Sequence, residues 1–315
     1  MFLFSLKRHG ILGVNARNLD YIFPTNPRQL YRLADSKLET KKIAESIDVP
    51  VPETYGVITF QNQVKQLSEV IGEYTSFVVK PSRGSGGDGI LVIKDVTDEG
   101  YLKVNGSILK PDDLQYHLYN ILGGMFSLGG QADVAIIEAA VQFDPVFDEI
   151  AYQGVPDIRV IIYRGVPAMA MLRLPTRVSD GKANLHRGGV GVGIDLSTGK
   201  TLKGIQYNRY IDEHPETGYA LSDRQIPHWQ TILEMAAKLS DETEFGYLGV
   251  DIVLDREKGP VLLEINARPG LSIQIANGEG LIWRLETIDE ALSKLSGIGE
   301  KIGFAKEAFG MGKSR

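Results

Sequence analysis

Short apolar runs recur in pairs along this chain, and a short turn or a glycine-rich stretch separates the members of each pair. The pairs are 76–80 with 90–94, 157–163 with 167–174, and 250–254 with 260–265. Tight turns join antiparallel strands, whereas parallel strands need a long crossover connection. Segments with helical patterns precede the first pair at 35–46 and separate the pairs at 111–122 and 226–239. The pattern predicts an α+β fold rather than a doubly wound parallel sheet.

Composition narrows the functional classes. The chain has 315 residues, of which 43% are hydrophobic, and a net charge of −6, which argues against a nucleic-acid binder. It has no cysteine, so disulfides, thiolate catalysis and thiolate metal sites are excluded. No apolar run is long enough for a membrane-spanning helix, and the N-terminus does not have the pattern of a signal peptide. We expect a soluble, cytoplasmic protein.

The last predicted hairpin carries three oxygen-bearing side chains. If Glu257 and Lys258 form its turn, residue 256 lies opposite 259, and Asp251 lies opposite Glu264. Asn266 then shares their face, because residues two apart on a strand point the same way. Two carboxylates and an amide are ligands that Mg²⁺ accepts. Taken alone, the pattern fits solvated polar positions on an antiparallel sheet equally well.

A second motif joins the first pair of strands. Lys80 ends a strand and is followed by the glycine-rich loop 83–89. An ammonium group and backbone N–H groups placed this way can bind phosphate oxygens. The loop is not a Walker A motif, because no Gly-Lys-Ser/Thr opens a helix here. A flexible hairpin turn is the alternative interpretation.

Further polar residues follow predicted strands or lie in the long loop 175–189. The candidates for nucleotide or substrate contact are Glu138, Asp157, Arg159, Asn184, Arg187 and Arg268. Guanidinium groups bind carboxylates and phosphates in a bidentate manner, so three arginines near the proposed loop and metal segments suggest an anionic substrate. His186 lies in the same loop, but a lone histidine is more often structural than catalytic.

Taken in order, these motifs resemble the ATP-grasp superfamily and, within it, the RimK-type α-L-glutamate ligases. The resemblance covers roughly 33–285. The motifs that carry it are Asp35-Ser36-Lys37, Val78-Val79-Lys80-Pro81, Ile137-Glu138, Pro156-Asp157-Ile158-Arg159, Ala183-Asn184-Leu185-His186-Arg187-Gly188-Gly189, Gly249-Val250-Asp251 and Leu263-Glu264-Ile265-Asn266-Ala267-Arg268-Pro269-Gly270. Seven ordered motifs are more specific than any single one.

The resemblance implies ATP clasped between two α+β lobes. The nucleotide residues that it implies are Lys37, Lys80, Gly86, Gly87, Glu138, Ala139, Asp157 and Asn184. The lysines and Asn184 would lie near the phosphates and the glycine loop would close over them. Glu138 and the backbone of Ala139 would meet the adenine, and Asp157 the ribose.

The same resemblance implies the metal site and the catalytic residues. Asp251, Glu264 and Asn266 would hold two Mg²⁺ or Mn²⁺ ions. Arg159, Arg187 and Arg268 would stabilise an acyl phosphate or tetrahedral intermediate, or receive an acidic substrate.

We expect four parts along the chain. They are a short leader over 1–32, an N-terminal lobe over 33–136 with an insertion at 99–134, a C-terminal lobe with the metal site over 137–297, and a tail over 298–315. The separate N-terminal domain that such ligases usually carry is absent or much reduced. Substrate choice therefore does not transfer from the glutamate ligases, and the insertion or a partner would replace that domain.

The predicted activity is a carboxylate–amine ligation that uses ATP, forms an acyl phosphate and releases ADP and phosphate. Glutamate is one candidate substrate, and the substrates are small molecules or peptides, at least one of them acidic. An ATP-grasp kinase and a non-catalytic ATP-binding or scaffold module are the alternatives, since fold alone does not fix function. The sequence leaves the acceptor, which could be a protein, and the oligomeric state open.

Overall fold

The computed structural model describes residues 8–84 and 86–310. The chain forms two compact units, and one of the boundaries between them falls within helix α5 (Lys37–Ser46). We call them the sheet-C unit (Met1–Ala34, Lys42–Pro50 and Phe143–Arg315) and the loop unit (Asp35–Lys41 and Val51–Gln142). Each is described by itself.

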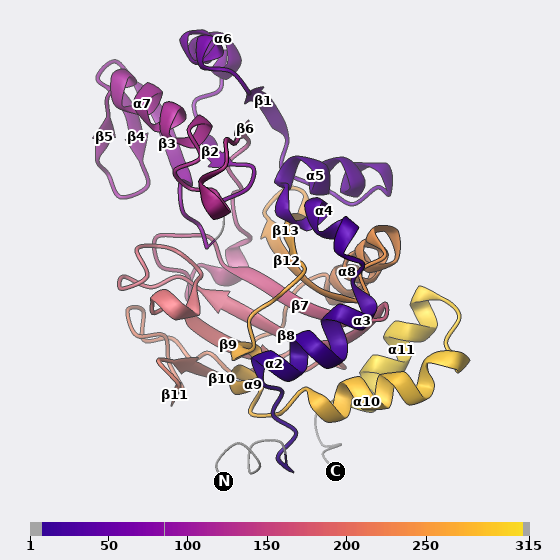
Figure 1. Cartoon of the computed structure of the whole chain (residues 1–315). Helices are drawn as coiled ribbons and strands as arrows, with labels where there is room; N and C mark the ends of the chain where they lie inside the picture. The colour runs from indigo at the N-terminus through magenta and orange to yellow at the C-terminus, as the bar shows by residue number, and fades with distance from the viewer. Residues whose placement is uncertain (1–7, 85, 311–315) are drawn as a thin grey trace. The chain divides into compact units, whose positions relative to one another are not determined.

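The loop unit is a six-stranded antiparallel sheet with helices packed on it (Figure 1). The strand order is β1-β6-β2-β3-β4-β5. The elements are β1 (Thr54–Ile58), α6 (Leu67–Ile71), β2 (Phe77–Pro81), β3 (Leu91–Thr97), β4 (Gly100–Lys103), β5 (Ile108–Leu109), α7 (Pro111–Leu122) and β6 (Ala135–Glu138). Leu114, Leu118 and Ile121 of α7 are fully buried in one cluster with Phe77 and Val79 of β2. The helix predicted over 111–122 is confirmed, and it begins at a proline, which suits the first turn.

The sheet-C unit is built on a seven-stranded antiparallel sheet in the order β11-β10-β9-β8-β7-β12-β13. Its strands are β7 (Asp157–Tyr163), β8 (Val166–Leu174), β9 (Val190–Ile194), β10 (Thr201–Gln206), β11 (Arg209–Ile211), β12 (Tyr247–Asp255) and β13 (Gly259–Asn266). Every residue of β7 is buried, so the strand runs through the middle of the core. The expected α+β class, with prominent antiparallel hairpins, is confirmed.

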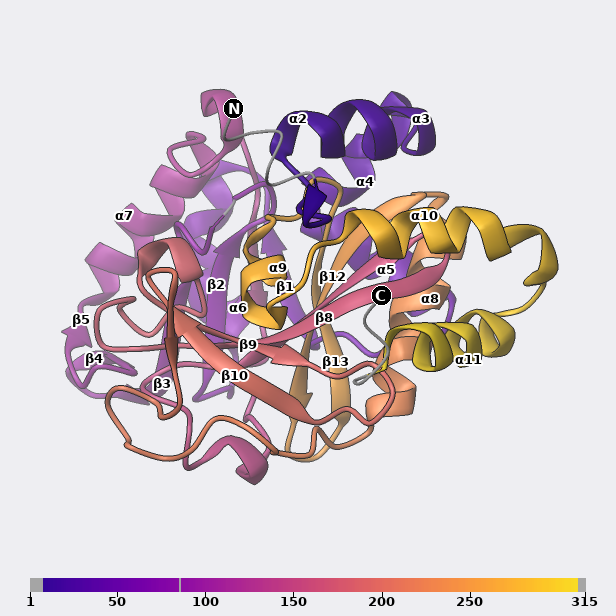
Figure 2. The ribbon, with the colours of Figure 1, turned by 90° about the horizontal axis from the view of Figure 1, so that it is seen from below.

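Helices pack against this sheet. Helix α8 (Trp229–Thr243) contacts β7, β8 and β12, and α11 (Ile298–Phe309) contacts β8 and α8. Helix α9 (Ser272–Asn277) lies against β8, β9 and β10, as Figure 2 shows. Helix α10 (Ile282–Ala291) precedes α11. The tail expected over 298–315 is therefore wrong for its described part, because α11 buries Ile302, Ala305 and Phe309.

The expected leader also contains regular structure. Residues 14–25 form one helical run of α2 (Val14–Ala16), a π-helical turn η1 (Arg17–Ile22) and α3 (Phe23–Thr25). Long-range hydrogen bonds hold it: Asn26 donates to the Tyr247 carbonyl at 2.7 Å and accepts from the Tyr247 N–H at 2.8 Å. Gln274 makes a similar pair of bonds with the backbone of Leu12. These contacts, together with the burial of Leu12 and Ile22, stabilise the segment.

Within the described residues, no helix has both the length and the apolar character needed to cross a bilayer. Residues 1–7 and 311–315 of the expected leader and tail lie outside the described part of the chain.

Candidate active site

The hairpin of β12 and β13 brings the three predicted metal ligands to neighbouring positions. Asp251 pairs with Glu264, as predicted, and Gly249 pairs with Asn266. The predicted turn register is wrong, because Asp255, not Arg256, lies opposite Gly259. The Asp255 carboxylate accepts the N–H groups of Glu257 and Lys258, both at 3.0 Å, and this lengthens the turn.

A bulge restores the register at the carboxylates. Ile252 pairs with Leu262 while Asp251 pairs with Glu264, so Leu263 is the extra residue. A bulge lets one strand carry an additional residue and re-aims the side chains that follow it. The longer turn and the bulge each shift the register by one residue, and the two shifts cancel. Asp251 therefore pairs with Glu264 as predicted, although the predicted two-residue turn is not formed.

A buried cluster of alternating charges surrounds Asp251, and we call it the arginine–aspartate cluster (Asp157, Arg159, Arg173 and Asp251). Arg159 is the cross-strand partner of Asp251 and donates to its two carboxylate oxygens at 2.7 and 2.5 Å. Arg173 donates to the same carboxylate at 2.6 Å and to Asp157 at 2.5 Å. The side chain of Asp251 is 1% exposed. Charged groups buried this deeply persist only when they are paired, as they are here.

Electrostatics differ between the two carboxylates. Burial raises the pKa of Asp157, because the nearby Arg173 only partly offsets the loss of water and Asp251 adds a like charge. Burial also opposes ionisation of Asp251, but Arg159 and Arg173 outweigh it and lower its pKa to about 2. Burial likewise disfavours the charge of Arg173, yet the two aspartates raise its pKa overall. Asp251 is therefore the fixed anion of the cluster.

The donor set of this hairpin is made of oxygen atoms, which a hard cation prefers. Among the described residues, no group of three His, Cys, Asp or Glu is placed to hold a metal, so an ion here would depend on Asn266 as well as the two carboxylates. A carboxylate has about four acceptor positions, and Asp251 uses three of them for guanidinium groups. Glu264 and Asn266 are half-buried rather than enclosed. Two carboxylates and an amide oxygen on adjacent strands fit Mg²⁺ chemically.

The long loop between β8 and β9 places two of the predicted residues. Asn184 caps the short helix η6 (Leu185–Arg187), with its side chain accepting from the His186 N–H at 3.0 Å. A β-carbon on Gly270 would lie 4.0 Å from His186 Nε2, so this loop lies beside the segment that follows β13. The histidine is thus a neighbour of the predicted site and not an isolated residue.

Arg268 begins that same segment. Its guanidinium lies over the ring of Tyr31, 4.8 Å from the centroid, and its N–H donates to Asn266 at 3.3 Å. The next carbonyl, that of Pro269, accepts a hydrogen bond from buried Arg17 at 2.6 Å. The helical run 14–25 thereby fixes the backbone next to Arg268.

The loop unit holds the other predicted residues, and its centre is a buried lysine–glutamate triad (Lys41, Lys80 and Glu138). Lys80 forms an ion pair with Glu138 Oε1, and Lys41 donates to Oε2 at 2.6 Å and to the Pro52 carbonyl at 2.7 Å. Two ammonium groups and one carboxylate leave a net charge of +1. The triad is therefore a buried cationic centre that includes a lysine of β2, the strand before the glycine-rich loop, and it suits a phosphate.

The remaining nucleotide candidates are also placed. Lys37 donates to the Gly84 carbonyl at 2.6 Å, so it is tied to the glycine-rich loop. Gly86 and Gly87 have positive φ angles of 64° and 78°, which glycine adopts without strain. Ser85 of the predicted loop lies outside the described residues. The Ala139 N–H, predicted to meet the adenine, donates to the Glu53 carbonyl at 2.8 Å.

Two charged residues of these clusters were not predicted. Lys41 is one of two adjacent lysines on α5, and the sequence shows no difference between them; only Lys41 is buried. Arg173 lies in the predicted strand 167–174, and its pairing with Asp157 depends on a bulge. The carboxylate of Asp157, which is predicted to meet a ribose, accepts a hydrogen bond from Arg173.

A family model matches residues 16–290 of the chain, and its description is "Sugar-transfer associated ATP-grasp". The chain belongs to this ATP-grasp family. The resemblance to the ATP-grasp superfamily is thereby confirmed, whereas the match gives no support to the RimK type. No curated protein sequence matches this ATP-grasp protein significantly.

Solved structures that resemble the chain include three enzymes with low sequence identity. D-alanyl-alanine synthetase A from Vibrio cholerae O1 biovar eltor is 14% identical with a TM-score of 0.50, over 84% of this chain and 66% of that one. D-cycloserine synthetase DcsG is 14% identical with a TM-score of 0.49, over 85% and 73% of the two chains.

The ATP-grasp ligase PsnB, solved with a minimal precursor, is 11% identical with a TM-score of 0.44. The match covers 86% of this chain and 64% of that one, so the chain spans less than two thirds of that enzyme's length. At such identities these likenesses concern the fold alone.

Proposed function

We propose that this ATP-grasp protein is an ATP-dependent ligase that joins a carboxylate to an amine through an acyl phosphate, releasing ADP and phosphate. The observation that carries the proposal is the arginine–aspartate cluster beside Glu264 and Asn266. It holds two guanidinium groups in fixed positions next to a carboxylate pair. Phosphoryl transfer to a carboxylate brings anions together, and fixed cations are what such a reaction requires.

Each cluster has a role in this proposal. The net positive lysine–glutamate triad attracts the phosphates, and Lys37 acts beside it on the glycine-rich loop. Arg159 and Arg173 hold Asp251 ionised and oriented, while exposed Arg268 and Arg187 remain the candidates for receiving an anionic substrate. Bound Mg²⁺, or Mn²⁺, would neutralise phosphate charge, with Glu264, Asn266 and Asp251 as ligands for one ion or two.

Substrate identity is proposed by charge. Exposed Arg268, backed by Tyr31, favours an acidic donor or acceptor, and glutamate, the substrate of the RimK-type ligases, is the first amino acid to test. The acceptor would be a small amine, a peptide or a protein terminus. We place the reaction in the cytoplasm, where ATP is available.

The test is a product analysis. The purified protein is incubated with ATP, Mg²⁺ and a panel of carboxylic acids, with hydroxylamine as the amine. ADP and a hydroxamate from one acid are expected, and E264A or K80A should abolish both. Arg256→Ala, at the exposed turn of the same hairpin, is the control that should retain activity.

Other products would change the assignment. AMP with pyrophosphate would contradict the acyl-phosphate route, and a phosphorylated alcohol would indicate a kinase. Tight binding of Mg·ATP with no turnover of any acid would indicate a nucleotide-binding module. In every case bound nucleotide should raise the melting temperature, since a ligand that binds only the folded state stabilises it by about 2.7 kcal/mol at a hundred times its Kd.

A further inference from the structure

The segment 117–133 of the loop unit contacts both ends of the glycine-rich loop. At the first end, buried Asp133 accepts the Arg83 N–H and the Ser127 hydroxyl, both at 2.8 Å, on one carboxylate oxygen. Its other oxygen accepts the Val134 N–H at 2.8 Å. Gly84 and Ser127 are joined by an antiparallel bridge. Three hydrogen bonds to one buried carboxylate fix where the loop leaves β2.

At the second end, the loop rejoins the sheet under a pair of rings. His117 Nε2 lies 2.9 Å from the Gly89 carbonyl, which can only accept, so the histidine is the donor. The ring of Phe126 lies 5.3 Å from that of His117 and packs directly on Gly89. A β-carbon at Gly89 would come within 2.6 Å of Phe126, and its φ is +75°, so this contact requires glycine.

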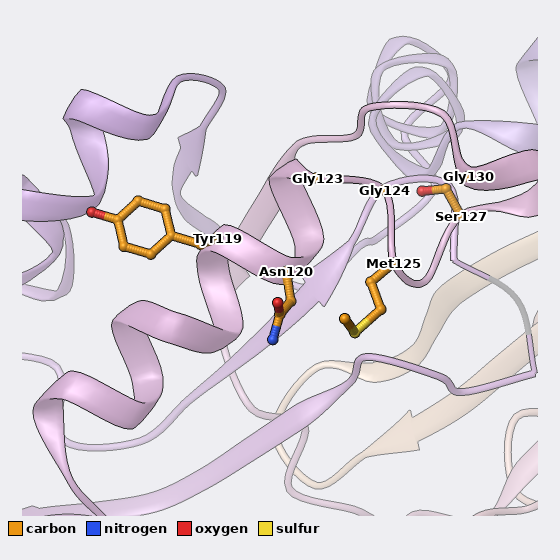
Figure 3. Close-up of a pocket in the computed structure, with 7 residues that line it drawn as sticks. All are labelled: Tyr119, Asn120, Gly123, Gly124, Met125, Ser127 and Gly130. Atoms are coloured by element: carbon orange, nitrogen blue, oxygen red, sulfur yellow. The ribbon is translucent and has the colours of Figure 1, made fainter.

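The contacting segment has a defined shape of its own. Gly124 has a φ of +81°, and a β-carbon there would approach the Gln131 carbonyl to 2.3 Å, so the chain doubles back closely. An open pocket of about 410 Å³ lies on it, lined by Asn120, Met125 and Ser127 among others (Figure 3). Asn120 and Met125 point to the same side of the segment in that view. The segment is therefore a folded support and not a loose connection.

We propose that Asp133 and His117 are positioning residues that fix the two ends of the glycine-rich loop and so set where its backbone meets the nucleotide phosphates. The inference rests on the proposed function, because it takes the loop to be a phosphate binder. In this role both side chains act through the backbone of the loop. A loop held at Arg83–Gly84 and at Gly89 loses less conformational freedom on binding, and a smaller entropy cost means tighter binding.

Variants separate the two anchors. D133N replaces an acceptor oxygen with a donor, and H117F keeps the ring packing on Phe126 but removes the donor. H117Q retains an N–H donor and is the conservative rescue. Asp113→Asn, on the exposed face of α7, is the matched control for D133N. S127A removes a single bond from Asp133 and serves if D133N does not fold.

Two measurements are made on the full chain. Calorimetric titration with a non-hydrolysable ATP analogue and Mg²⁺ should show about tenfold weaker binding for D133N and H117F, with H117Q and D113N near wild type. In the hydroxamate assay KM for ATP should rise more than kcat falls. Trypsin cleavage after exposed Arg83 should be several-fold faster in the two anchor variants, since the loop opens more often.

The outcomes are distinguishable. Unchanged nucleotide affinity in D133N and H117F, with a wild type that binds, overturns the proposal. Equal cleavage rates after Arg83 overturn the anchoring itself, whether or not nucleotide binds. A wild type that does not bind the analogue contradicts the proposed function and, with it, the positioning role, while faster cleavage in the variants would still establish the anchors as structural.

Discussion

At the scale of single residues, Arg173 of the sheet-C unit forms ion pairs with two buried aspartates. It joins Asp157 to Asp251, two carboxylates that are almost completely buried. The structure therefore makes its loss more costly than the loss of any surface arginine, because two buried anions would share the remaining guanidinium of Arg159.

We predict that R173M lowers the free energy of unfolding by about 3–5 kcal/mol, the usual cost of removing one partner from a buried ion pair. Chemical denaturation measures it. The matched control is R164M, whose ion pair with Asp289 is 41% and 42% exposed and should contribute less than about 1 kcal/mol. Equal losses in the two variants would contradict the importance of the buried cluster. R173K, measured in the same way, covers the case in which R173M does not fold.

Lys41 supplies one of the two positive charges of the lysine–glutamate triad. In K41M the lysine–glutamate triad changes from a net charge of +1 to zero, because Glu138 then neutralises Lys80 alone. We expect affinity for a non-hydrolysable ATP analogue to fall about tenfold in calorimetric titration. K42M, an exposed neighbour on the same helix, should bind as the wild type does. Unchanged affinity in K41M would show that the triad does not attract the phosphates.

At the scale of elements, the N-terminal run is the part most dependent on a few side chains. Asn26, which is 3% exposed, closes two hydrogen bonds with the backbone of Tyr247. We expect N26A to lower the free energy of unfolding by about 1–3 kcal/mol, because a buried N–H and carbonyl lose their partners. Denaturation of N26A is compared with N15A, an exposed position in the same run. A loss below about 0.5 kcal/mol in N26A would mean that the run is held by other contacts.

The registers of the two hairpins show which parts of the site follow from the sequence and which depend on bulges. The strands and the Asp251–Glu264 pair follow from the apolar runs and their turns. A tight turn at Arg164-Gly165 would put Leu172 opposite Asp157, but Ala168 is bulged and Arg173 takes that place. The carbonyl of Ala168 accepts a hydrogen bond from buried Arg284 at 2.8 Å, a contact over 116 residues. A contact with so distant a residue helps to stabilise the bulge, and the local sequence pattern holds no information about it.

The same limit applies to residues that were predicted. Lys80 and Glu138 were each chosen from the motif around them, and the structure joins them in one ion pair. Their assigned roles at phosphate and adenine remain predictions. The helical run 14–25 was missed because its stabilising partners, Tyr247, Pro269 and Gln274, lie more than 200 residues away.

At the scale of the whole molecule, a buried histidine bears on the expected response to mild acid. His214 is 1% exposed; burial lowers its pKa, although the Pro175 carbonyl and Glu216, 3.6 Å away, act in the opposite direction. Its folded-state pKa therefore lies below that of the unfolded chain. The contribution of neutral His214 to the free energy of unfolding is fully present above the ordinary histidine pKa of about 6.5. It falls as pH drops through that value towards the folded-state pKa.

We accordingly expect the melting temperature to fall between pH 7.5 and pH 5.5, and to fall less in H214Q. Glutamine can still donate to the Pro175 carbonyl, which lies 3.1 Å from His214 Nε2, but it does not titrate. His228, at the exposed start of α8, supplies the control H228Q, which should follow the wild type. An equal decrease in wild type and H214Q would assign the acid sensitivity to other groups.

The bulge at Leu263 also has a practical meaning for anyone who wishes to label this protein. It separates the exposed tip of the hairpin, 256–258, from the carboxylate pair by a local irregularity that absorbs changes in strand alignment. A short epitope or a fluorophore-bearing peptide spliced in after Glu257 would lengthen the tip without realigning Asp251 and Glu264. The exposed tip of the hairpin is thus a suitable site for a label that leaves Asp251 and Glu264 in position.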